Sequence, residues 1–333
     1  IYFYLNQNLK FKMPRILFFF LLSFFSVQAQ ISGCTDPLSK NYNPDAAENN
    51  GSCIYRNLKL KPEYSAKLSD SVKETSGLTA FDNLLWTHND NHDTTIYGLD
   101  SLGKIKKEIV LKNVTNHDWE EISQDSLYLY IGDFGNNAKG NRTDLNILKI
   151  EKKSFLEENP VIEKISFSYS DQTDLLAQKP NTTNFDCEAF IVSKDSIYLF
   201  SKQWKSSKTN IYVLPNKSGN QIAQFKNTLD TEGLVTGAVY LEKKKLIALC
   251  GYSKTGKTFL YLLYDFKNHD FLSGNKRKID LKLPFHQIEG ITTKDGIHYF
   301  ITNESLVRKP VLNNPQQIHY LDLSSVLDLY LHK

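Results

Sequence analysis

A short sequence motif occurs five times along this chain and places an oxygen-bearing side chain just ahead of an apolar strand. Its second residue is usually small, as in Ser76-Gly77-Leu78 and Glu289-Gly290-Ile291. The five leading positions are Ser76, Glu120, Glu188, Thr236 and Glu289. If these positions meet in space, their three carboxylates need a compensating cation because like charges repel. Carboxylate and hydroxyl oxygens are ligands of hard cations, so the pattern predicts a calcium site.

The elements that must position these residues are short strands in a repeated order. The motif recurs about every 50 residues, and such a period is typical of β-propellers. The sequence therefore predicts an all-β protein, a five-bladed β-propeller over residues 57–333. A six-bladed propeller is the alternative, because the longest interval contains the polar stretch 171–184. Residues 57–68 alternate as a strand does, and we expect them to complete the last blade and close the ring.

Polar side chains also gather where the second strand of each predicted blade ends. They are Asn89, Asp90, Asp133, Asn136, Asn137, Lys202, Gln203, Asn303 and Glu304. In a closed ring these ends share one face with the leading positions, so we predict a mouth for a small ligand or a surface partner. Asp90, Asp133 and His117 are the candidates for a catalytic group that activates water. The alternative is that such residues satisfy tight turns.

Residues 1–29 have the pattern of a lead-in followed by a signal peptide that starts at Met13. Arg15 precedes an apolar run over residues 16–25, and small residues at 27–29 predict a cleavage site. The run is too short to span a membrane. We therefore expect a secreted, periplasmic or cell-surface protein with no transmembrane helix.

The formal net charge of +3 comes from Lys10, Lys12 and Arg15 in the predicted leader. Without them the acidic and basic residues balance, which argues against a nucleic-acid partner.

Residues 30–56 form a separate segment rich in turn residues, with Cys34 and Cys53 near its ends. In an exported chain these cysteines predict a disulfide. A lipid attached to Cys34 is the alternative, because residues 31–34 also fit a lipoprotein cleavage box. Five side chains of the segment could gather calcium or could simply be solvated: Asp36, Asn41, Asn43, Asp45 and Glu48.

Three resemblances add expectations. The order Ser, Glu, Glu, Thr, Glu at the blade starts resembles the soluble calcium-activated nucleotidases, the apyrase five-bladed propellers. That resemblance implies that Ser76, Glu120, Glu188, Thr236 and Glu289 hold calcium. The phrases Asp118-Trp119-Glu120 and residues 132–137 resemble a group of uncharacterised secreted bacterial propellers. Residues 33–53 resemble a cysteine-bounded module of secreted proteins from gliding bacteria.

The sequence thus leaves three functions open. The first is an exported calcium-binding propeller with a ligand-binding or partner-binding mouth. The second is a calcium-dependent hydrolase of phosphate anhydrides or esters, as the apyrase resemblance implies. The third is a structural surface protein without catalysis.

Overall fold

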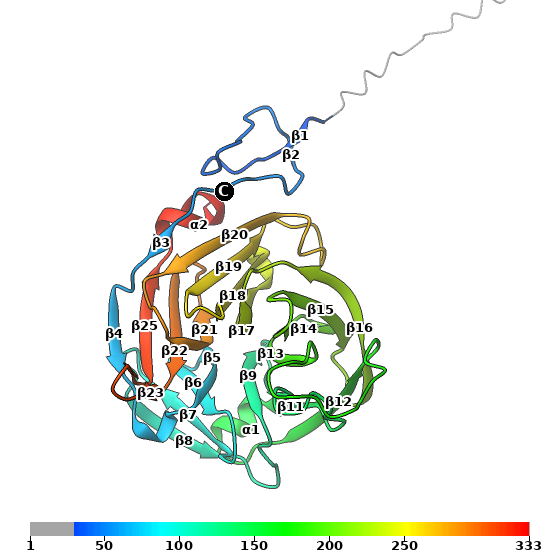
Figure 1. Cartoon of the computed structure of the whole chain (residues 1–333), viewed down its shortest axis with the longest axis vertical. Helices are drawn as coiled ribbons and strands as arrows, with labels where there is room; N and C mark the ends of the chain where they lie inside the picture. The colour runs from blue at the N-terminus through cyan, green and yellow to red at the C-terminus, as the bar shows by residue number, and fades with distance from the viewer. Residues whose placement is uncertain (1–29, 333) are drawn as a thin grey trace, which may run out of the picture.

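The computed structural model describes residues 30–332, and their regular structure is almost entirely β-strand. The predicted signal peptide lies outside these residues. The sheets surround a common centre (Figure 1), which is the arrangement of a β-propeller. Within residues 30–332, no helix combines the length and apolar character needed to cross a bilayer.

The sheets are built from strands that follow one another along the chain. One sheet contains β5 (Thr75–Phe81), β6 (Leu84–Asn89), β7 (Thr95–Leu99) and β8 (Ile105–Val110). An eight-stranded sheet joins two such units, β9 (Trp119–Gln124), β10 (Tyr128–Asp133), β11 (Asn146–Glu151) and β12 (Ile162–Tyr169) with β13 (Asp186–Val192), β14 (Ser196–Lys202), β15 (Thr209–Pro215) and β16 (Gly219–Leu229). The two units meet where β12 and β16 pair in parallel.

The remaining large sheets include strands from the N-terminal side of the chain. β17 (Leu234–Leu241), β18 (Leu246–Tyr252), β19 (Thr258–Tyr264) and β20 (Asn275–Leu281) are extended by β3 (Lys59–Leu60). β21 (Gln287–Thr293), β22 (His298–Glu304) and β25 (Gln317–Asp322) are completed by β4 (Tyr64–Lys67). β4 pairs antiparallel with β25, with Tyr64 opposite Tyr320. This pairing confirms that part of the predicted strand over residues 57–68 completes the last sheet, which leaves fewer exposed edges. Residues 59–60 of that stretch pair with β20 in the preceding sheet instead.

The remaining elements are short. They are β1 (Ser32–Gly33), β2 (Glu48–Asn49), β23 (Leu306–Arg308), β24 (Leu312–Asn314), the 3₁₀ turns η1 (Asp70–Val72) and η2 (Glu242–Lys244), and the helices α1 (Lys152–Leu156) and α2 (Ser324–Leu331).

The hydrophobic core lies between neighbouring sheets, because most strands carry apolar residues on both faces. Between the first two units, Trp86, Trp119 and Phe155 are fully buried in one cluster. The rings of Trp86 and Phe155 meet edge to face, with their centroids 5.0 Å apart. At the centre, β5, β9, β13, β17 and β21 contact one another in succession, and β21 contacts β5 again (Figure 1).

Candidate functional site

The repeated sequence motif forms a β-bulge at the start of an inner strand. Opposite β10, Gly132 pairs with Glu121 and Asp133 pairs with Trp119, so Glu120 is the extra residue. The register shifts in the same way at three more leading positions, Glu188, Thr236 and Glu289. In β5 the shift lies one step later, between Ser76 and Thr79. A bulge re-aims the side chain of the extra residue, so one local device orients side chains on successive inner strands.

The small second residue of the motif allows neighbouring inner strands to approach each other closely. Gly77 has φ +73°, and a Cβ there would lie 2.5 Å from the backbone nitrogen of Ile122 in β9. A Cβ at Gly290 would lie 2.8 Å from Cβ of Leu78 in β5. Side chains at these positions would push the strands apart, so the glycines permit the convergence of the leading residues.

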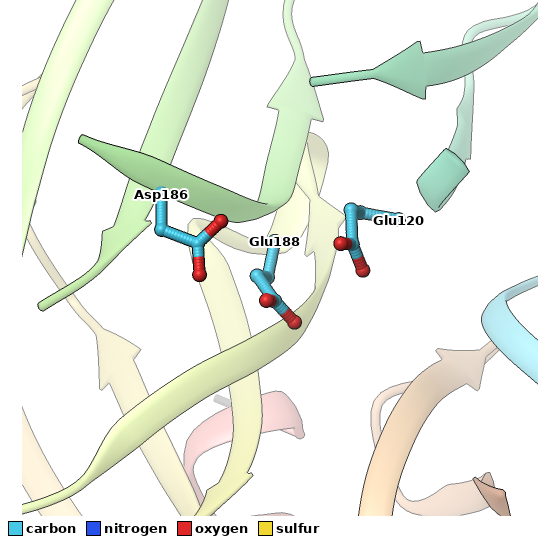
Figure 2. Close-up of side chains that lie close together, drawn as sticks. All are labelled: Glu120, Asp186 and Glu188. Carbon is cyan, nitrogen blue, oxygen red and sulfur yellow. The ribbon is translucent and has the colours of Figure 1, made fainter. Parts of the chain in front are cut away.

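Three buried carboxylates converge at the centre of the ring. Glu120 comes from β9, and Asp186 and Glu188 come from β13; Figure 2 shows their side chains gathered together. One oxygen from each lies within 4.8 Å of the others. The oxygens of Asp186 accept from the backbone N–H of Asn136 (2.7 Å) and the indole N–H of Trp204 (2.7 Å). Such outer contacts fix the direction of a carboxylate, as partners of metal ligands do.

Lys202 is the positive charge closest to this group. Its Nζ lies 2.8 Å from Oε2 of Glu188, and its side chain is 4% exposed. The ammonium also lies over the rings of Trp204 (4.9 Å) and Tyr252 (5.3 Å). Burial opposes its charge, but Glu188 and the neighbouring carboxylates raise the pKa of Lys202 well above its usual value. Lys202 is therefore a resident counter-ion of the carboxylates.

A polar cavity of about 200 Å³ opens beside these residues. Its acidic lining consists of Asp90, Asp118, Glu120, Glu188, Glu289 and Glu304. Lys202 is the one basic residue among the described residues that line it. Ser76, Asn137, Trp204 and Tyr252 also contribute. A cavity with this excess of negative charge favours a cationic ligand.

The carboxyl groups around the cavity hold protons more tightly than usual. Burial raises the pKa of Glu120 well above its usual range, and the nearby charge of Glu188 adds to the effect. Burial also raises the pKa of Glu289 to about 8 and that of Asp118 to about 6. Oε2 of Glu289 is buried without a hydrogen-bond partner among the described residues. These groups become fully ionised near neutral pH only if a cation offsets their burial.

The two hydroxyl positions of the predicted ring bond to neighbouring strands. Oγ of Ser76 donates to the carbonyl oxygen of Glu120 (2.7 Å) and lies 3.5 Å from Oε2 of that residue. Oγ1 of Thr236 donates to the carbonyl oxygen of Ile288. Ser76 reaches the cavity as well, so the structure brings Ser76, Glu120, Glu188 and Glu289 together around one space.

The predicted mouth residues divide into two groups. Asp90, Asn137, Lys202 and Glu304 line the cavity. The others are engaged with neighbouring residues: Asn89 with Ser71 and Asp93, Asp133 with Arg142 and His117, Asn136 with Phe185, Gln203 with Ser206, and Asn303 with Pro315 and His319.

The three candidates for a catalytic group also separate. Asp90 faces the cavity, and burial with the charge of Glu74 raises its pKa to about 8. Asp133 is held by Arg142, with Oδ1 2.8 Å from Nη2, and by His117, with Oδ2 3.1 Å from Nδ1. Asp133 and His117 therefore belong to an ion-pair group at the rim.

Asp186 and Asp118 were missed as site residues in the sequence. A signal was present, because Asp118-Trp119-Glu120 and Asp186-Cys187-Glu188 share the spacing Asp-x-Glu. The function of Lys202 as a counter-ion had no comparable signal, since it depends on the pairing that sets Lys202 of β14 opposite Asp186 of β13.

Several side-chain oxygens of the N-terminal segment are engaged in other contacts. Oδ2 of Asp36 accepts from the hydroxyls of Tyr55 (2.9 Å) and Tyr264 (2.6 Å). Oδ1 of Asn43 accepts from the N–H of Asp45, and Glu48 forms an ion pair with Lys267. Cys34 and Cys53 form the predicted disulfide. Because the Cys34 sulfur is in that bond, it is not free to form the thioether of a lipid anchor, and that alternative is wrong.

Comparisons with known proteins leave the family open. No family model matches the chain, and no curated protein matches it. Among solved structures, the structure of a streptogramin B lyase is similar to this chain, with a TM-score of 0.40 and 11% sequence identity. The match covers 78% of this chain and 97% of the lyase chain. A similarity of this size assigns no function.

Proposed function

We propose that this protein is an exported five-bladed β-propeller that binds calcium at its central carboxylates and a ligand or partner at the mouth above them. The convergence of Glu120, Asp186 and Glu188, with one oxygen from each within 4.8 Å of the others, carries the proposal. The acidic excess of the adjoining cavity supports it.

The blade count follows from treating each four-stranded unit as one blade. The eight-stranded sheet is then two blades that meet through their outer strands, β12 and β16. The inner strands β5, β9, β13, β17 and β21 form the central ring. The polar stretch 171–184, which favoured a sixth blade in the sequence, contains no strand in the structure.

Calcium suits the donor set better than a smaller or softer ion. Calcium–oxygen distances are about 2.3–2.6 Å, so two oxygens on opposite sides of the ion lie about 4.6–5.2 Å apart. Magnesium demands near-ideal octahedral geometry and keeps several waters, whereas calcium accepts several carboxylate ligands in a flexible arrangement. The cluster offers carboxylate oxygens alone, which disfavours soft metals. Ser76 and Glu289 line the same cavity, where Ser76 can add a ligand directly or through water and Glu289 can do so through water.

Export is consistent with the disulfide between Cys34 and Cys53, since such bonds persist in oxidising compartments. Under this proposal residues 30–56 form a stapled segment beside the propeller and residues 1–29 direct export.

A hydrolase of phosphate anhydrides or esters is the second candidate, and Asp90 is the observation that favours it. Its pKa of about 8 leaves a protonated carboxyl group at the cavity near neutral pH. Such a group can donate a proton to a leaving oxygen. Calcium bound beside it would neutralise charge on a phosphoryl group.

Calorimetric titration tests the calcium site. Chelator-treated wild-type protein should bind calcium, and Glu188→Gln should weaken binding at least tenfold by removing one charged ligand. Glu48→Gln, in the N-terminal segment, is the matched control and should bind as the wild type does. Absence of binding to the wild type, or equal affinity in Glu188→Gln, would exclude the site. The hydrolase is tested by phosphate release from nucleoside diphosphates with calcium and with chelator, and no turnover would exclude it for these substrates.

A further inference from the structure

Lys202 adjoins two groups of carboxylates at one cavity. The first group is Glu120, Asp186 and Glu188, which could hold a metal ion. The second group is Glu289 and Glu304, both of which line the cavity with Lys202. The charge of Lys202 acts on both groups, since it lowers the pKa of Glu188 and of Glu289 against the effect of burial.

The two groups of carboxylates differ in the partners of their oxygens. Oε2 of Glu188 is bound to Nζ of Lys202 at 2.8 Å. Oε2 of Glu289 has no hydrogen-bond partner among the described residues, although Glu289 is only 5% exposed. A buried carboxylate oxygen without a partner is costly, so Glu289 offers an unsatisfied acceptor to a neighbouring ammonium.

A divalent cation and the Lys202 ammonium compete for the same carboxylate. Their positive charges also repel each other, because the protein surroundings screen charge much less than water does. Lysine has a flexible four-carbon stem, which allows its ammonium to change partners without movement of the backbone.

We propose that Lys202 is an exchangeable counter-ion, which leaves Glu188 and pairs with Glu289 when a divalent cation binds among Glu120, Asp186 and Glu188. This inference rests on the proposed calcium site. Before binding, Lys202 neutralises the cluster and keeps it compact. After binding, it satisfies the oxygen of Glu289. Lys202 thereby limits the affinity of the site and couples its occupancy to the mouth.

The fluorescence of Trp204 should report on the exchange, because Trp204 contacts both Lys202 and Asp186. Its ring lies under the ammonium, 4.9 Å from Nζ, and its indole N–H donates to Asp186. The other tryptophans, Trp86 and Trp119, are fully buried in the core. Departure of Lys202 should change the emission of Trp204, and a Trp204→Phe variant should lose that part of the signal.

The test compares calcium affinity in Lys202→Met, Glu289→Gln and the double variant by calorimetry. Lys202→Met should bind calcium about tenfold more tightly than the wild type, because a competing positive charge is gone. Glu289→Gln should weaken binding in the wild-type background, because displaced Lys202 loses its second partner, and should have little effect in Lys202→Met. The calcium-dependent change in Trp204 emission should be lost in Lys202→Met. Lys254→Met, an exposed lysine at a neighbouring groove, is the control and should not alter affinity.

The outcomes separate this inference from the calcium site itself. If Glu188→Gln weakens binding but Lys202→Met does not tighten it, the exchange is excluded and the site stands. If Glu289→Gln weakens binding equally in both backgrounds, Glu289 is a direct ligand and the exchange is likewise excluded. If neither the wild type nor Lys202→Met binds calcium, the site itself fails. Should Lys202→Met prove unfolded by circular dichroism, Lys202→Gln takes its place with the same expected direction.

Discussion

Two regions of this protein are rich in side-chain oxygens, the N-terminal segment between Cys34 and Cys53 and the centre of the ring. In the N-terminal segment, Asp36 accepts from two tyrosine hydroxyls and from the N–H of Leu38, and Asn43 caps a turn of its own backbone. At the centre, three carboxylates converge, and one oxygen of Glu289 has no partner among the described residues.

The difference teaches that oxygen content alone does not make a cation site. The short side chains of Asp and Asn readily accept from nearby backbone N–H groups, and a turn-rich segment consumes its acceptors in this way. At the centre, most backbone N–H groups of the inner strands pair across the sheets, and those of Ile122 and Ala238 donate to Glu121. The carboxylates there must be compensated by Lys202, by protons or by a metal ion.

The largest expected effect concerns the staple of the N-terminal segment. Replacement of Cys34 and Cys53 by serine should lower the free energy of unfolding by about 3 kcal/mol, because the open loop gains chain entropy in the unfolded state. Denaturant titration measures this loss. The additional stability conferred by calcium should not change. If that increment fell as well, the two regions would be coupled and the comparison would break.

The second effect concerns calcium itself. At a free calcium concentration a hundred times the dissociation constant, the free energy of unfolding should rise by about 2.7 kcal/mol, since the ion binds the folded chain alone. Glu120→Gln should remove most of this increment. Asp45→Ala in the N-terminal segment should keep it. Thermal melts with calcium and with chelator provide the measurement, and the reverse pattern would place the site in the N-terminal segment.

The smallest effect concerns how the N-terminal segment attaches to the ring. Tyr264→Phe removes the hydroxyl of β19 that donates to Asp36 at 2.6 Å. A hydrogen bond to a charged group contributes about 1.5 kcal/mol or more, so the free energy of unfolding should fall by about that amount. Tyr299→Phe is the matched control, because its buried hydroxyl has no partner among the described residues. That control should be neutral or slightly stabilising, and equal losses in both variants would show that the contact with Asp36 contributes nothing.

Much of the fold could be predicted from the sequence because its signals are local. The repeated motif specifies a β-bulge and an apolar strand within a few residues. Its glycine, as at Gly77 and Gly290, lets neighbouring inner strands approach each other. Residues 57–68 were predicted to complete the last sheet, and their second half, β4, does so. The disulfide could be predicted because only two cysteines flank a segment without a core of its own.

The sequence by itself determined which side chains begin the inner strands and that they would be oxygen-bearing. The tertiary structure alone decided which of them share a cavity, that Asp186 joins Glu120 and Glu188, and that Lys202 compensates them. The physical reason is that a bulge is set by neighbours in the chain, whereas charge compensation depends on distances between strands far apart in the sequence. The same reason explains the N-terminal segment, whose Asp36 is satisfied by Tyr264 across the interface with the ring.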